Sequence, residues 1–148
     1  MTNALLVIAC SGRKGDAPAH ALDLYRGVMY QSYRANVGQA KPHVIILSAL
    51  HGFIRGDAVI VPYEQMMSET RAAEITARLQ VFDPQAWPRA DNVMFAGSGL
   101  YRRVMLAALH RQRLGGFRFD LSALHQTTGG IGMQRQQLGQ WLRRLDNE

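Results

Sequence analysis

The run Ala4-Leu-Leu-Val-Ile-Ala9 carries the strongest structural pattern in the chain. Six consecutive apolar residues are typical of a strand that is covered on both faces, as strands in parallel sheets are. Two further segments, His43–Ser48 and Asn92–Ala96, are also mostly apolar, and each is followed by a polar or glycine-containing loop. These three segments predict the centre of a mainly parallel sheet.

Segments with helical periodicity lie between and after these strands. Apolar side chains recur at helical spacing over 22–37, 69–82 and 100–113, and Ser68 is a favourable N-cap for the second segment. A last predicted helix places its apolar residues on one face, and these are Leu138, Trp141, Leu142 and Leu145.

Two shorter segments complete the expected secondary structure. Residues 58–61 are expected to be extended, and Gly115-Gly116 turns the chain into a predicted fourth strand over 117–121. Strands that alternate with helices favour three layers and right-handed crossovers. We therefore predict one α/β domain over residues 1–148, in which helices cover both faces of a mainly parallel sheet of about four strands.

The bulk composition favours a cytoplasmic protein without a membrane partner. The chain has 148 residues, of which 47% are hydrophobic, and this is enough to bury one core. No apolar run approaches the roughly 20 residues of a membrane span, and the start lacks the basic region of a secretory signal. A single cysteine, Cys10, allows no intrachain disulfide, which fits a reducing compartment.

The charge balance indicates an anionic partner. Lys and Arg total 17 against 11 acidic residues, a formal net charge of +6, and all of these cations except Lys14 and Lys41 are arginines. Arginine binds phosphate in a bidentate manner, and a positive field attracts polyanions. A GC-rich genome would also enrich arginine, and both explanations remain open. The charge does not separate a nucleic acid from a free nucleotide.

The segment Ile46–Glu64 begins as a strand and continues as a loop with many reactive groups. Its polar side chains are Ser48, His51, Arg55, Asp57, Tyr63 and Glu64. Loops that follow parallel strands meet at the carboxyl edge of the sheet, where α/β proteins place their ligands. Because residues 10–15 and 96–101 follow strands in the same way, we expect Lys14, Asp57 and Ser98 to line one cleft.

Basic and glycine-rich loops predict a phosphate site at that edge. Ser11, Arg13 and Lys14 combine a tight turn with fixed positive charge, although the full P-loop pattern is absent. Two other loops open predicted helices, and their candidate binding residues are Gly97, Ser98, Gly129 and Gly130. Glycine lets a ligand approach the backbone, and a helix N-terminus stabilises negative charge. A solvated basic turn and ordinary loop geometry are the alternatives.

Asp57 and Glu64, next to Tyr63, are the candidates for acid–base chemistry. A carboxylate in a partly apolar setting can have a raised pKa, or it can stabilise the sugar cation that forms during glycosidic cleavage. The alternatives are a turn-forming role for Asp57 and a solvated carboxylate for Glu64. The histidines and Cys10 show no zinc-ligand spacing, so neither a metal nor a cofactor is predicted.

Several motifs resemble the YaaA-like family. They are Cys10-Ser-x-x-Lys14, Asp23-Leu-Tyr-Arg-Gly27, Leu47-Ser-Ala-Leu-His-Gly-Phe-Ile54, Ile60-Val-Pro-Tyr-Glu64 and Gly130-Ile-Gly-Met-Gln134. That family includes peroxide-stress proteins that bind and protect DNA, and smaller bacterial and phage domains of unknown function. The resemblance spans nearly the whole chain, which is much shorter than the larger family members.

The resemblance implies a shared pocket. The positions that match it are Ser11, Lys14, Asp23, Tyr25, Gly27, Ser48, Gly52, Asp57, Pro62, Tyr63, Gly97 and Gly130. In such a pocket Tyr25 stacks on a base or fills the core, and Asp23 caps a helix or pairs with a basic neighbour. His51 stands where relatives often have Tyr, so the resemblance assigns it no role.

The sequence thus predicts an enzyme that acts on a nucleotide or on a nucleic acid, with DNA favoured over RNA, and that cleaves or exchanges an N-glycosidic bond. A base within a duplex would have to be flipped out to reach the pocket. The alternative is a non-catalytic DNA-binding protein of the stress response. The basic face of the last helix, with Arg135, Arg143 and Arg144, is either solvated or in contact with nucleic acid. A homodimer formed through exposed helix faces is compatible with both.

Overall fold

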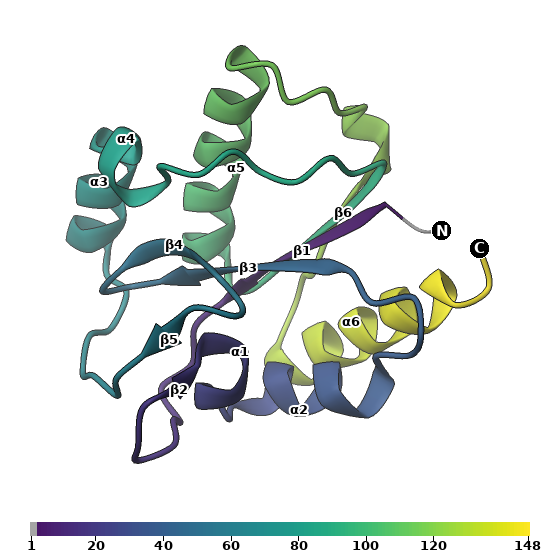
Figure 1. Cartoon of the computed structure of the whole chain (residues 1–148), viewed down its shortest axis with the longest axis horizontal. Coiled ribbons are helices and arrows are strands. Elements are labelled where there is room, and N and C mark those ends of the chain that lie inside the picture. Colours follow the sequence, from purple (N-terminus) through teal and green to yellow (C-terminus); the bar gives the residue numbers. More distant parts are fainter. Residues whose placement is uncertain (1–2) are drawn as a thin grey trace.

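A computed structural model of the chain describes residues 3–148, and its elements are arranged in three layers (Figure 1). Within this range the central sheet has five strands in the order β4-β3-β1-β6-β7. They are β1 (Ala4–Ala9), β3 (His43–Ser48), β4 (Gly52–Arg55), β6 (Asn92–Ala96) and β7 (Leu124–Gln126). All neighbouring pairs are parallel except β3 and β4, which are antiparallel. The predicted α/β class and mainly parallel sheet are confirmed, with one strand more than expected.

Helices cover both faces of this sheet. The helices are α1 (Ala21–Leu24), α2 (Val28–Asn36), α3 (Glu69–Ala77), α4 (Leu79–Phe82), α5 (Gly99–Leu114) and α6 (Ile131–Leu145). A 3₁₀ turn over Leu121–Ala123 precedes β7, and β2 (Ala19–His20) pairs with β5 (Val59–Ile60) in a separate small ribbon. In Figure 1, α2 and α6 lie side by side on one face, and α5 and α3 lie on the other.

The alternation of side chains along β1 divides the core into two parts. Leu5 and Val7 pack with α3 and α5, whereas Leu6 and Ile8 pack with α1, α2 and α6. All four side chains are fully buried. This two-sided burial is why the strand is continuously apolar, and it places β1 in the middle of the sheet.

Two predicted helices are interrupted. The segment 22–37 breaks at residues 25–27, because the backbone at Gly27 passes so close to Ser11 that a Cβ there would lie 2.7 Å from the Ser11 Cβ. The segment 69–82 breaks at Arg78, whose φ of −130° and ψ of 44° are not helical. The predicted cap is confirmed, since the Ser68 hydroxyl accepts a hydrogen bond from the Arg71 N–H at 3.0 Å.

The predicted strand over 117–121 is wrong. Phe117 and Phe119 stack on each other, and Phe117 makes an edge contact with Trp87. These aromatic rings extend the core beside α5, and the free edge of β6 pairs instead with Leu124–Gln126. The aromatic alternation of the segment therefore reflects packing and not strand pairing.

A tight reversal at Gly52 produces β4, which the sequence did not predict. Gly52 has a φ of +78°, and a Cβ there would lie 2.5 Å from the Phe82 carbonyl oxygen. Only glycine fits both conditions without strain. The chain therefore runs back along β3 towards the amino edge of the sheet and takes the residues after β4 with it. No helix among the described residues has the length and apolar character needed to cross a membrane.

Replacing Gly52 with Ala is expected to destabilise the fold. The left-handed backbone and the clash with Phe82 together should lower the free energy of unfolding by about 2–4 kcal/mol. Gly132→Ala is the matched control, because a Cβ there meets nothing within 4 Å and the residue lies in α6. It should leave stability unchanged or raise it by about 0.5 kcal/mol. Urea denaturation of both variants measures the difference, and equal midpoints would contradict this account of the turn.

Candidate functional site

The carboxyl ends of β1 and β3 meet a chain of hydroxyl groups. The Ser48 hydroxyl lies 2.7 Å from that of Tyr63, which lies 2.5 Å from that of Tyr25. The Ser48 oxygen also accepts the backbone N–H groups of Leu50 and His51, at 3.2 and 3.0 Å. A hydroxyl oxygen accepts two hydrogen bonds, so Ser48 must donate to Tyr63, whereas either hydroxyl can donate in the contact between Tyr63 and Tyr25. We call Ser48, Tyr63 and Tyr25 the hydroxyl chain.

Lys14 places a positive charge against the hydroxyl chain. Its Nζ lies 4.5 Å from the centre of the Tyr63 ring and 5.8 Å from that of Tyr25, within range of a cation–π interaction. The loop that carries it is fastened by backbone hydrogen bonds from Gly15 to Leu24 and from Arg26 to Arg13, both of 2.8 Å. Lys14 is therefore held in position by main-chain contacts.

Burial keeps the phenols of this region neutral. Desolvation raises the pKa of Tyr25 and, more strongly, that of Tyr63, and the thiol of Cys10 adds to the rise at both. Desolvation also lowers the pKa of His51, whose ring meets the Tyr63 ring edge-on at 5.4 Å. At neutral pH the cluster therefore contains protonated phenols and a neutral imidazole.

Cys10 connects three elements at the end of β1. Its Sγ lies 3.3 Å from the hydroxyl of Tyr101 in the first turn of α5, and it accepts the Ala49 N–H from the turn after β3 at 3.4 Å. The thiol is half-buried between these partners.

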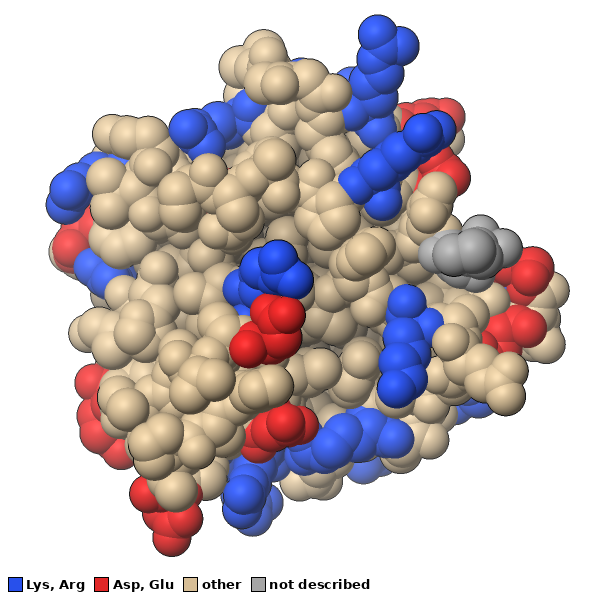
Figure 2. Space-filling model, in the orientation of Figure 1, with Lys and Arg blue, Asp and Glu red and all other residues tan. Residues whose placement is uncertain are grey.

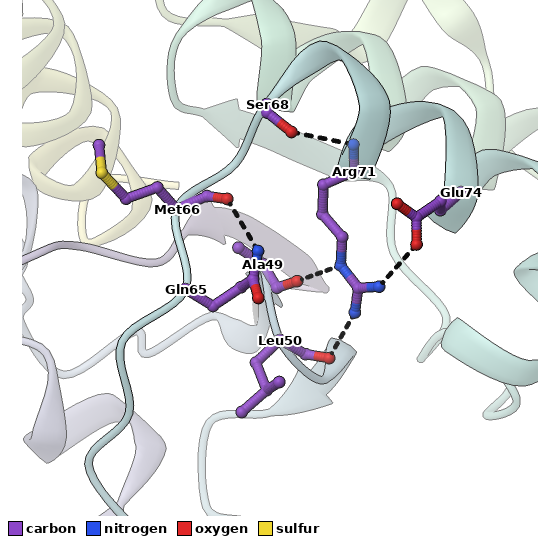
Figure 3. A network of polar contacts seen from close by, with 7 residues as sticks. All are labelled: Ala49, Leu50, Gln65, Met66, Ser68, Arg71 and Glu74. Carbon is purple, nitrogen blue, oxygen red and sulfur yellow. Dashed lines mark hydrogen bonds and ion pairs between the residues drawn. The ribbon is translucent and has the colours of Figure 1, made fainter.

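An arginine from α3 holds the turn that follows β3 (Figure 3). Arg71 donates from Nε to the Ala49 carbonyl at 2.6 Å and from Nη2 to the Leu50 carbonyl at 2.8 Å, and its Nη1 pairs with Glu74 at 3.3 Å. Its side chain is only 17% exposed. This contact orients the two N–H groups that the Ser48 oxygen accepts. Arg71 carries no local sequence signal, because its partners are backbone carbonyls about twenty residues away.

Three helices begin at the same edge without a side-chain cap. They are α2 after Gly27, α5 after Ser98 and α6 after Gly130. Gly27 lies against Ser11 at the end of β1, and Ser98 follows β6 directly. Because the first N–H groups of a helix have no partner within it, this edge presents free donors and positive ends of helix dipoles.

A buried threonine fixes the loop before α6. The Thr127 hydroxyl accepts the Gly97 N–H at 3.1 Å and lies 2.9 Å from the Gln134 side-chain oxygen. The Gln134 amide in turn donates to the Gly129 carbonyl at 2.9 Å. These contacts join the loops after β6 and β7. Gln134 closes the motif Gly130-Ile-Gly-Met-Gln134, but only burial identifies Gln134 and Thr127 as positioning residues.

Arg102, in the first turn of α5, was also missed. Its Nε is buried and has no hydrogen-bond partner within residues 3–148. A buried donor without a partner is costly, and native proteins rarely leave one unpaired. Arg102 therefore adds an unused cationic donor to the start of α5.

The structure brings together part of the predicted site. Lys14, Tyr25, Ser48, His51 and Tyr63 form one cluster, as the preceding contacts show. The glycine loops with Gly97, Ser98, Gly129 and Gly130 follow β6 and β7 at the same edge. Ser11 bonds within its own turn, and Arg13 and Glu64 are exposed in the neighbouring loops.

The expectation that Asp57 shares this cleft is wrong. Because β4 runs antiparallel to β3, Arg55 pairs with Ile45 and the following residues lie beside the amino end of β3. There Asp57 forms an ion pair of 3.1 Å with Arg55, and its side chain is 63% exposed. Asp23 is exposed on α1 and its charge acts on Tyr33, outside the hydroxyl chain. Asp57 thus lies across the sheet from Lys14 and Ser98.

Fold and site together define a three-layer α/β protein. At the carboxyl edge of its sheet, neutral hydroxyl groups lie close to the N-termini of three helices. Over residues 5–140 the chain matches a family of unknown function, DUF6884, and it belongs to that family. No curated protein and no solved structure matches the chain. The YaaA-like resemblance therefore stays a prediction. Among the described residues no group of three or more metal-binding side chains gathers.

The tyrosines should resist ionisation. Burial raises the pKa of all five above the ordinary 10.0. Since each folded-state pKa exceeds its unfolded value, this contribution to stability is complete below pH 10 and is lost as the pH rises further. Absorbance at 295 nm should therefore show tyrosinate only above pH 10, together with loss of circular dichroism. Normal titration of several tyrosines in a folded protein would refute the buried cluster.

Removing the Arg71 side chain should loosen the turn after β3. Arg71→Ala deletes two charge-assisted bonds to carbonyls, and we expect a loss of about 1.5–3 kcal/mol in the free energy of unfolding. Arg103→Ala is the matched control, since its ion pair with Glu69 is exposed and should contribute less than about 1 kcal/mol. Hydrogen exchange at Leu50 and His51 should accelerate only in Arg71→Ala. Similar losses of unfolding free energy in both variants would show that Arg71 does not specifically stabilise the turn after β3.

Proposed function

We propose that the protein binds a nucleotide, free or within a nucleic acid, with its phosphate at the carboxyl edge of β1, β6 and β7. The observation that carries this proposal is the start of three uncapped helices at that edge. In contrast, α3 has its own cap in Ser68. An anion satisfies free N–H groups and the positive ends of helix dipoles at once.

Cationic side chains support the same assignment. Lys14 lies over the hydroxyl chain, and the unpartnered Nε of Arg102 lies in the first turn of α5. The net charge of +6 attracts polyanions over a longer range. Charges of both signs are interspersed on the face seen in Figure 2, so the field is not concentrated there. This distribution favours a defined phosphate contact over a broad basic surface.

The aromatic groups suit the remainder of a nucleotide. The exposed His51 ring contacts the half-buried Tyr63 ring, which lies beside Lys14, and the two rings offer surfaces on which a base can stack. Stacking on aromatic rings is tolerant of base identity. The two rings therefore suit free nucleotides and single-stranded or flipped bases in a nucleic acid, with DNA favoured over RNA.

Cleavage or exchange of the N-glycosidic bond is the reaction we propose for this site. Such chemistry needs a carboxylate near the sugar. Asp57 lies at the other edge, so Glu64, which follows Tyr63 in an exposed loop, is the remaining candidate. The neutral phenols would orient the substrate by hydrogen bonds and would not act as bases at neutral pH.

The second candidate is non-catalytic DNA binding. It is favoured by the hydroxyl chain itself, in which the Ser48 and Tyr63 groups already satisfy one another. Release of free base from a nucleotide or oligonucleotide separates the two candidates. If base is released and Glu64→Gln abolishes this without changing affinity, the enzyme is supported. Binding without product supports the alternative.

Loss of the Lys14 charge should weaken phosphate binding. Lys14→Gln is expected to reduce the affinity for AMP about tenfold, the value of one charge-assisted contact. Arg113→Gln removes an equal charge at the far end of α5 and should leave affinity within about twofold. Calorimetry on the full chain measures both, and adenosine tests whether the phosphate matters. Equal binding of adenosine and AMP, or equal effects of the two substitutions, would reject this site.

A further inference from the structure

We infer that a second ligand site lies at the amino end of β3, and that it binds a small monocarboxylic acid with an apolar body. This site is separate from the carboxyl edge and does not depend on the function proposed above. A cavity of about 500 Å³ opens there, within the range of roughly 300–1,000 Å³ that is usual for ligand pockets.

The lining of this cavity combines an apolar floor with a few polar groups. The apolar residues are Leu22, Pro42, Val44, Ile45, Ala86 and Pro88. The polar groups come from Tyr33 on α2, from Lys41 before β3 and His43 at its start, from Arg55 at the end of β4 and Asp57 after it, and from Gln85. Ligand pockets share this composition, in which apolar area supplies affinity and placed polar groups orient the ligand.

Tyr33 provides the observation that points to a ligand. Only 7% of its surface is exposed, and it lines the cavity. Its hydroxyl has no hydrogen-bond partner among residues 3–148 and is not a fully buried atom, so it is open to the cavity and free to donate to a ligand. Burial and the charge of Asp23 raise the pKa of Tyr33, so the hydroxyl remains a donor at neutral pH. It is therefore suited to a carboxylate oxygen.

The charges around the cavity select one negative charge. Arg55 and Asp57 neutralise each other through two contacts of 3.2 and 3.1 Å. Lys41 forms no ion pair within the described part of the chain, so one positive charge remains among the residues that line the cavity. Asp23, whose charge acts on Tyr33, lies outside this lining. A single carboxylate balances it and accepts from Tyr33 at the same time.

The walls of the cavity are fastened before any ligand arrives. Gly56 donates its N–H to Val44 at 3.1 Å and accepts from Leu22 at 2.9 Å. On the opposite side, the Gln85 side chain donates to the Phe53 carbonyl at 3.1 Å. A preformed site loses little conformational freedom on binding, so even a small ligand can be retained.

The test is an NMR titration of ¹⁵N-labelled protein with indole-3-acetate, with tryptamine as the probe of equal ring and opposite charge. Indole-3-acetate should change the chemical shifts of the backbone amides of Val44, Gly56 and Gln85, and tryptamine should bind at least fivefold more weakly. Equal or tighter binding of tryptamine would overturn the proposed charge selectivity. Shifts confined to the loop around Lys14 would overturn the location.

Three variants test the roles of individual residues. Tyr33→Phe keeps the packing and removes only the hydroxyl, and Lys41→Gln removes the free charge. Each substitution should lower the affinity for indole-3-acetate at least threefold. Asp57→Asn should raise the affinity for indole-3-acetate at least threefold, because Arg55 is released to bind the carboxylate. Arg113→Gln, outside the cavity, is the control for net charge. Unchanged affinity in Tyr33→Phe, or weaker binding in Asp57→Asn, would refute the site.

Discussion

Burial of β1 on both faces is the constraint on which the other features depend. A strand covered on each side needs a layer of helices above and below it, and its two edges must be paired. Parallel partners meet this requirement in β3 and β6. Their common direction then brings the loops that follow them to one edge. Lys14 and Ser98 lie there as a result of the packing of Leu5, Leu6, Val7 and Ile8.

The two edges of the sheet differ in their electrostatics. At the carboxyl edge the titratable phenols are held neutral, and positive potential comes from helix N-termini and Lys14. At the amino edge, Arg55 and Asp57 form an exposed ion pair in which the charges cancel. The difference arises because helices after parallel strands all begin at one edge. The fold itself therefore determines where the proposed phosphate site lies.

The sequence was sufficient for features that local patterns encode. Continuous apolar runs identified β1, β3 and β6. Residues at the ends of these strands and in the loops after them, among them Lys14 and Ser48, lie close together as expected. Asp57 was misplaced because its position depends on the reversal at Gly52, which an isolated glycine does not reveal. The prediction of a strand over 117–121 was wrong because aromatic alternation fits core packing and strand pairing equally well. Arg71 could not be predicted from its neighbours in the sequence, because its hydrogen bonds go to the backbone carbonyls of residues about twenty positions away.

The Ser48 hydroxyl has a fixed direction. Two peptide N–H groups of the turn after β3 occupy both acceptor sites of its oxygen, so its proton points away from that turn and towards Tyr63. Reversing this hydroxyl would leave one of the two peptide N–H groups without its acceptor, which is costly in a part-buried site. The turn held by Arg71 thus sets the orientation of the hydroxyl dipole that Tyr63, fifteen residues further along the chain, receives.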